Sequence, residues 1–119
     1  MTSPETHKAY LELKDILKTI PRSDCPKGWS KHVLEGYKQL LKLYPHIEIL
    51  QIKEKFAEFR LYYAAPAEQR PFIDKIIYDI DDKCSVTCMC CGEVGELRNE
   101  GWVSVLCDKC FDQKLPNKE

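Results

Sequence analysis

Two Cys-x-x-Cys pairs near the C-terminus constrain this chain more than any other feature of its sequence. Cys88 and Cys91 form the first pair, Cys107 and Cys110 form the second, and fifteen residues separate the pairs. Zn²⁺ accepts thiolate ligands in a tetrahedral arrangement, and two intervening residues let one tight knuckle direct both sulfurs at one ion. The separation of the pairs lies at the edge of the range typical of zinc sites. The sequence therefore predicts one structural zinc ion bound by four cysteines.

The segment between the pairs has the composition of a β-hairpin. Residues 99–101 (Asn-Glu-Gly) are turn formers, and apolar side chains from Trp102 to Leu106 alternate as in a strand. Gly92 directly follows a predicted ligand, where a knuckle often needs a positive φ that glycine adopts at low cost. These patterns predict a zinc ribbon.

A disulfide framework is the main alternative for the cysteines, and it requires an oxidising compartment. The first twenty residues contain six charged side chains and no apolar run that resembles a signal peptide. No stretch approaches the roughly 18 apolar residues of a membrane span. We therefore expect a reduced, cytoplasmic protein that does not bind membranes.

Three further cysteines fall outside the two predicted ligand pairs. Cys90 is adjacent to a ligand, and two adjacent residues rarely both reach one tetrahedral ion, so we interpret it as a bystander. Cys25 and Cys84 are interpreted as small buried hydrophobic residues. A redox role for these three thiols stays open.

Apolar periodicity predicts three helices upstream of the ribbon. The first begins at Ser3 and Pro4 and ends by Pro21, the second runs from Trp29 to Pro45, and the third starts at Pro66 or Pro71. The predicted apolar stripes are Tyr10, Leu13, Leu17 and Ile20 in the first helix, Val33, Leu34, Tyr37, Leu40, Leu41 and Tyr44 in the second, and Phe72, Ile73, Ile76, Ile77 and Ile80 in the third.

Residues 47–63 are rich in β-branched and aromatic types without a helical period, which predicts a hairpin turning near residues 54–58. The apolar phase changes between Ile49 and Leu50, indicating a bulge or a strand covered on both faces. We expect an α+β fold in which residues 1–83 form helices packed on a hairpin. Residues 84–112 then form the ribbon, and residues 113–119 form a tail.

The charge distribution bears on the kind of partner. Residues 1–65 contain eleven Lys and Arg against eight Asp and Glu, whereas residues 66–119 contain seven against eleven. Four thiolates and one Zn²⁺ would add two further negative charges to the second part. A zinc finger that binds phosphates is normally basic. The ribbon half is therefore not typical of a nucleic-acid-binding finger.

Several motifs together resemble a known family. They are Ile52-Lys53-Glu54-Lys55-Phe56 leading to Arg60-Leu61-Tyr62, Thr87-Cys88-Met89-Cys90-Cys91-Gly92, Gly101-Trp102 and Leu106-Cys107-Asp108-Lys109-Cys110. Over most of its length the chain resembles the small zinc-ribbon proteins of bacteriophage and prophage genomes. The resemblance implies zinc binding and a mobile-element origin. By analogy it also implies binding and modulation of a host protein, such as a component of a defence system.

The chain departs from that family at two places. The family usually has glycines after the phenylalanine of the first motif, whereas Ala57 and Glu58 follow Phe56 here, so a tight glycine turn cannot be assumed. It also often has other residues at the positions of Cys84 and Cys90.

Two surfaces are candidates for partner binding. The first combines a tryptophan with acidic residues of the ribbon, which would suit a basic partner protein, although such residues on a solvated face need no partner. The second combines basic and aromatic residues of the hairpin, which would suit single-stranded nucleic acid, although interleaved glutamates also fit a solvated edge. The first set is Trp102, Glu93, Glu96, Glu100 and Asp108, and the second is Lys53, Lys55, Arg60 and Tyr62. Trp29 and Trp102 could each be buried in the core or exposed.

No catalytic motif is present in the sequence. His46-Ile47-Glu48 upstream of a Cys-x-x-Cys is similar to the zinc-deaminase pattern, but the proline expected before the first cysteine is missing. Four cysteine ligands would also leave no coordination position for a catalytic water. We expect a non-enzymatic, zinc-stabilised module that binds a protein, with nucleic-acid binding through the hairpin as the alternative.

Overall fold

The computed structural model describes residues 3–99 and 101–114 and has the α+β architecture expected from the sequence. The main elements are α1 (Pro4–Leu17), α2 (Ser30–Leu43), β1 (Glu48–Lys55), β2 (Glu58–Ala64), α3 (Arg70–Cys84), β3 (Glu96–Arg98), β4 (Ser104–Leu106) and α4 (Asp108–Lys114). Short 3-10 turns, η1 (Lys27–Trp29) and η2 (Ala67–Gln69), precede α2 and α3. Within the described ranges, no helix has the length and apolar character needed to cross a membrane.

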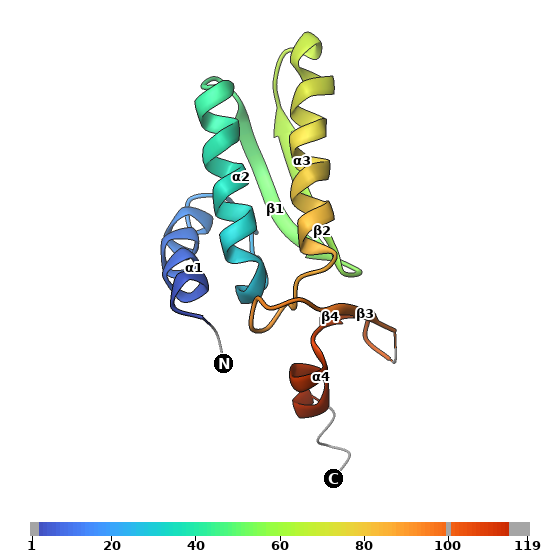
Figure 1. Cartoon of the computed structure of the whole chain (residues 1–119). Coiled ribbons are helices and arrows are strands. Elements are labelled where there is room, and N and C mark those ends of the chain that lie inside the picture. The colour runs from blue at the N-terminus through green and yellow to red at the C-terminus, as the bar shows by residue number, and fades with distance from the viewer. Residues whose placement is uncertain (1–2, 100, 115–119) are drawn as a thin grey trace.

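Helices α2 and α3 lie side by side against the β1–β2 hairpin, and α1 packs on the outer side of α2 (Figure 1). The two central helices approach closely at Gly36, where an added Cβ would lie 2.2 Å from Cδ1 of Ile80. Trp29, Leu40, Ile52 and Ile73 are among the fully buried side chains between these layers. The C-terminal ribbon lies at one end of the assembly, next to the tip of the hairpin (Figure 1).

The helices begin and end largely where the sequence predicts. The Ser3 hydroxyl accepts a hydrogen bond from the Thr6 backbone N–H at 3.1 Å, which caps the start of α1. Pro66 precedes η2, and Pro71 lies in the first turn of α3 where a missing N–H costs little.

One predicted core residue of α3 is wrong. The apolar periodicity places Phe72 in the stripe, but its side chain is 62% exposed, whereas Ile73 and Ile80 are buried. Successive residues of an α-helix are rotated by about 100°, so Phe72 lies well to one side of the stripe centred on Ile73.

The hairpin has a bulge, which is one of the two interpretations that the change of apolar phase leaves open. Ile49 pairs with Tyr63, and Gln51 pairs with Tyr62, so Leu50 is an additional residue in β1.

The hairpin turns within residues 54–58, as the sequence predicts, and a tight turn forms there without glycine. Lys55 pairs with Glu58, and the two intervening residues Phe56 and Ala57 have φ angles of 53° and 67°. Two successive positive φ values between paired strands define a type I′ turn, which favours glycine or asparagine. The Ala57 N–H donates to Oε2 of Glu54 at 2.8 Å and stabilises this unusual conformation.

The ends of the predicted segments also shift slightly. Helix α3 continues through Cys84, the first residue of the expected ribbon, and the Cys84 side chain is fully buried in the main core. Helix α4 continues to Lys114, so residues 113 and 114 belong to a helix and not to a tail. Residues 115–119 of the expected tail lie outside the described residues.

Candidate metal centre

Four cysteines from two distant segments meet in the ribbon. The Sγ atoms of Cys88, Cys91, Cys107 and Cys110 all lie within 4.8 Å of one another. Three of these side chains are buried, and that of Cys107 is partly exposed. These are the four residues that the sequence predicts as ligands, and as a group they could hold a metal ion.

The two knuckles of the cluster share one local geometry. The N–H of Cys91 points to Sγ of Cys88 at 3.5 Å, and the N–H of Cys110 points to Sγ of Cys107 at 3.4 Å. In each knuckle the next residue also donates its N–H to the first cysteine's carbonyl, at 3.0 Å in one and 2.9 Å in the other. Gly92 has a φ of 88°, as its position after the first knuckle predicted. Donors aimed at sulfur favour the thiolate form that binds metals.

The size of the cluster fits a tetrahedral ion. A zinc–sulfur bond of about 2.3 Å implies that sulfurs at the corners of a tetrahedron lie about 3.8 Å apart. Sγ of Cys91 lies 3.7 Å from Sγ of Cys107, across the two knuckles. A disulfide would need about 2.05 Å. The donor type, number and spacing are therefore consistent with one zinc ion.

Electrostatics within the cluster favour a bound cation. Burial opposes ionisation of Cys88, but backbone N–H groups directed at its sulfur outweigh that cost and lower its pKa to about 7. Burial raises the pKa of Cys91 and of Cys110, and thiol neighbours raise each further. Bringing four thiolates together requires a positive charge among them, which a divalent ion supplies.

Arg98 links the ribbon hairpin to the second knuckle, a role that the sequence did not reveal. Its Nε donates to the Leu106 carbonyl at 3.1 Å, and a guanidinium nitrogen donates to Oδ1 of Asp108 at 2.8 Å. The guanidinium also lies 4.4 Å from the centre of the Phe111 ring. The only sequence signal was an arginine on a short strand, which is ordinarily solvated.

The first knuckle is also joined to the helical core. The Gly28 N–H donates to the Met89 carbonyl at 2.8 Å, and a Cβ at Gly28 would lie 2.0 Å from the Cys88 carbonyl oxygen. Nε1 of the buried Trp29 donates to the Thr87 carbonyl at 2.9 Å. Since Thr87 directly precedes the first ligand, the metal centre and the core hold each other in place.

His32 adds a second contact to the same threonine. Its Nε2 lies 3.1 Å from Oγ1 of Thr87, and that hydroxyl donates its own hydrogen to the Lys83 carbonyl at 2.6 Å. The threonine oxygen therefore accepts from His32, which assigns the hydrogen to Nε2. Burial, and then the charge of Lys83, lower the pKa of His32 below its ordinary value.

The residues predicted for a protein-binding face are only partly gathered by the structure. Trp102 is 76% exposed, in contrast to the buried Trp29. Glu93 and Glu96 are exposed, and Asp108 forms the ion pair with Arg98. Glu100 lies outside the described residues.

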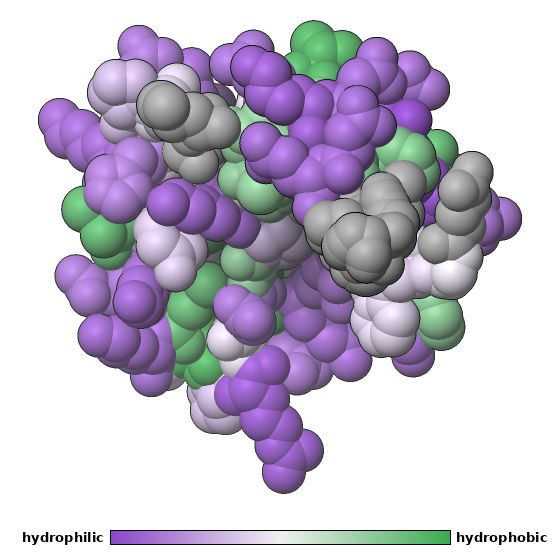
Figure 2. Space-filling view, turned by 90° about the horizontal axis from the view of Figure 1, so that it is seen from below, coloured by the Kyte–Doolittle hydropathy of each residue, from purple (hydrophilic) through white to green (hydrophobic). Residues whose placement is uncertain are grey.

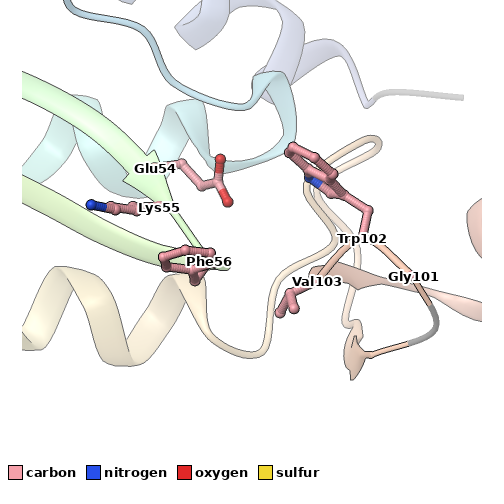
Figure 3. Close-up of a pocket in the computed structure, with 6 residues that line it drawn as sticks. All are labelled: Glu54, Lys55, Phe56, Gly101, Trp102 and Val103. Atoms are coloured by element: carbon pink, nitrogen blue, oxygen red, sulfur yellow. The ribbon is translucent and has the colours of Figure 1, made fainter.

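Trp102 shares a cavity of about 310 Å³ with Phe56, a residue that the sequence did not single out for binding. Figure 3 shows Phe56 at the tip of the hairpin on one side of this cavity and Trp102, from the ribbon, on the other. Phe56 is 69% exposed and has the positive φ of the strained turn. Glu54, Lys55 and Val103 complete most of the lining.

The basic residues of the hairpin lie on its outer face. Lys53 pairs directly with Arg60, and Nζ of Lys53 lies 5.6 Å from the centre of the Tyr62 ring. Arg60 forms an ion pair with Glu58 at 2.8 Å, which neutralises one of the cations. Lys55 is exposed beside the Phe56 ring, with Nζ 5.7 Å from its centre.

The other three cysteines do not join the four-sulfur cluster. Cys90 is exposed, as expected of a bystander, and Cys25 and Cys84 are buried free thiols in the core. Burial raises the pKa of both core thiols, so neither resembles a reactive cysteine.

Comparison of the chain with protein-family models, with curated proteins and with solved structures finds no match in any of the three.

Proposed function

We propose that this protein is a non-enzymatic interaction module whose fold is stabilised by one structural zinc ion. The four-sulfur cluster is the observation that supports this proposal. Four cysteine ligands fill a tetrahedral shell, whereas catalytic zinc sites keep one position for water or substrate. Thiolates select zinc over the harder cations Mg²⁺ and Ca²⁺. Zinc in this position contributes folding free energy to a core of modest size.

The cavity between Trp102 and Phe56 supports a role in protein binding. Exposed aromatic residues are the side chains that most often dominate the energetics of protein interfaces. Phe56 is held outward by a turn whose positive φ angles disfavour any residue with a Cβ, and such strain is concentrated at functional sites. Figure 2 shows the ribbon end of the molecule as largely hydrophilic, with separate hydrophobic areas. The partner would therefore insert a small apolar anchor and not cover a broad apolar surface.

Nucleic-acid binding through the hairpin is the second candidate. Its support is the strand register, which places Lys53, Arg60 and Tyr62 on one face. The ion pair between Glu58 and Arg60 weakens the field of that face. The mobile-element origin and the host partner remain predictions of the family resemblance.

Metal content tests the zinc part of the proposal. The protein is purified under reducing conditions, and zinc is quantified by mass spectrometry for the wild type, Cys107→Ser and Cys90→Ser. We expect one zinc per chain in the wild type and in Cys90→Ser, and loss of zinc with much of the fold in Cys107→Ser. Full zinc content in Cys107→Ser would show that the ligand assignment is wrong.

A co-purification experiment separates the two binding candidates. Tagged wild-type protein, Trp102→Ala and Lys53→Ala are recovered from bacterial lysate, and bound macromolecules are identified. The proposal predicts a stoichiometric protein that is lost with Trp102→Ala and kept with Lys53→Ala. Nucleic acid that survives nuclease treatment and is lost with Lys53→Ala would favour the second candidate.

A further inference from the structure

The two edges of the β1–β2 hairpin differ in whether their outward backbone groups are paired. On the β1 edge, the Ile52 carbonyl accepts from the Asp24 N–H at 2.9 Å, and the Ile52 N–H donates to Oγ of Ser23 at 2.9 Å. The connector between α1 and η1 therefore covers this edge, much as a neighbouring strand would.

Within residues 3–99 and 101–114, no segment covers the β2 edge in a comparable way. Ile52 pairs with Leu61. Because the N–H and C=O groups of Ile52 point away from β2, this is a non-hydrogen-bonded pair of an antiparallel ladder, and the N–H and C=O groups of Leu61 point away from β1 in the same way. Leu61 therefore presents a donor and an acceptor on the free edge, and Tyr63 does so two residues later. At the start of this edge the Phe59 N–H is taken by Oδ1 of Asp81, at 2.9 Å. Among the described residues, no hydrogen bond to the outward groups of Leu61 is present.

A groove runs along this free edge. A cavity of about 420 Å³ is lined by β2 from Glu58 to Tyr62 and, across from it, by α3. The helical wall consists of Asp74, Ile77, Tyr78 and Asp81 of α3. The last three lie three, four and seven positions after Asp74, so the four side chains form one stripe of the helix. Tyr78 is 67% exposed, so its ring forms an aromatic wall of the groove that is open to solvent.

The charge of the groove indicates what would occupy it. Three of its side chains are acidic, Glu58, Asp74 and Asp81, and Arg60 is the one basic side chain that lines it. Two of the carboxylates are held in place, because Asp74 accepts from the Tyr63 hydroxyl at 2.7 Å and Asp81 accepts from the backbone of Phe59. An occupant with basic side chains would complement this net negative charge.

We propose that the β2 edge and α3 form a docking groove for an extended, basic peptide segment of a partner protein. The segment pairs with the outward backbone groups of Leu61 and Tyr63 as a third strand, the mode known as β-strand addition. Its alternate side chains contact Tyr78 and Ile77, and its basic residues lie near Asp74 and Asp81. This surface is separate from the cavity between Trp102 and Phe56 and does not depend on it.

A display library of random twelve-residue peptides, screened against the zinc-loaded protein, tests the proposal. We expect selected peptides to be rich in Lys or Arg and in β-branched residues, without a central proline. Binding of a synthetic selected peptide is then measured by calorimetry. Selection of no peptide, or of acidic peptides only, would overturn the proposal.

Substitutions locate the bound peptide. We expect Tyr78→Ala to weaken binding about tenfold, and the rim charge reversal Glu58→Lys to weaken it at least threefold. Leu11→Ala, at a half-exposed side chain of α1 outside the groove, serves as the control that should leave the dissociation constant unchanged. If Trp102→Ala loses binding and Tyr78→Ala does not, the peptide binds in the cavity between Trp102 and Phe56. That result would refute the groove while supporting the proposed function.

Amide hydrogen exchange tests the strand pairing directly. In the free protein, the outward amide of Leu61 should exchange faster than that of Tyr62, which pairs with β1. Bound peptide should slow the exchange of Leu61 and Tyr63 at least tenfold. A synthetic peptide N-methylated at its central backbone amides should not produce this protection. Unchanged exchange at Leu61 under saturating peptide would contradict β-strand addition.

Discussion

The two tryptophans offer a matched test of how the core and the metal centre are joined. Trp29 is fully buried and donates through Nε1 to the Thr87 carbonyl, one residue before the first ligand, whereas Trp102 is 76% exposed. The same change to phenylalanine at both positions should therefore have very different effects on the free energy of unfolding.

The magnitude for Trp29→Phe follows from two losses. The Thr87 carbonyl loses its donor in a buried setting, which costs about 1–3 kcal/mol. Phenylalanine also has two fewer carbons, and at about 0.8 kcal/mol for each buried carbon this costs roughly 1.6 kcal/mol. The sum is about 2.5–4.5 kcal/mol, a large part of the stability of a small domain. Trp102→Phe should change the free energy by less than about 0.5 kcal/mol.

The assay is urea denaturation of the zinc-loaded variants under reducing conditions, followed by far-ultraviolet circular dichroism. Each variant retains one tryptophan, so its fluorescence reports one site: the Trp29 signal should be blue-shifted and the Trp102 signal close to that of tryptophan in water. Trp29→Phe should also release zinc more readily to a chelator. Equal stability of the two variants would contradict this prediction, because it would mean that the bond to Thr87 and the burial of Trp29 contribute nothing.

Three other substitutions test separate features. Phe56→Gly should raise the free energy of unfolding by about 0.5–1 kcal/mol in urea denaturation, because glycine adopts the positive φ without strain. The same change should weaken partner binding. A fall in stability would contradict the assignment of strain to this turn. Arg98→Gln should weaken zinc affinity about 10–100-fold in a chelator competition, because it loses the hydrogen bond to Asp108. Unchanged affinity would show that the contacts of Arg98 with the second knuckle are dispensable. The pKa of His32 is lower in the folded protein than in the unfolded chain, so near pH 6.5 and below the unfolded chain binds more protons than the folded protein. The free energy of unfolding should therefore fall as pH drops from 7.5 to 6 in excess zinc. His32→Gln should reduce this fall in stability. A pH profile of stability identical to that of the wild type would contradict the role of His32.

The strongest local patterns in the sequence predicted their structures correctly. The cysteine spacing identified the four residues that meet in the cluster, because metal geometry leaves few alternatives. The change of apolar phase at Leu50 indicated a bulge or a doubly covered strand, since the side-chain period of a strand is two, and the structure has the bulge. Gly92 was expected at a positive φ and has one.

The features that escaped prediction depend on contacts between distant segments. Local propensity argues against a type I′ turn at Phe56 and Ala57, but strand pairing and the Glu54 carboxylate stabilise it. Arg98 has no pattern that marks it, because its partners are defined only once β3 and the second knuckle come together. The two tryptophans could not be told apart from the sequence, since burial depends on how η1 meets the ribbon.

In the proposed arrangement, one zinc ion with four sulfur ligands links the ribbon to the helical core. X-ray absorption at the zinc edge of the purified, reduced protein measures the number, type and distance of these ligands. A single shell of four sulfurs at about 2.3 Å is expected. A shell that includes nitrogen or oxygen at about 2.0–2.1 Å, or one with fewer than four sulfurs, would contradict it.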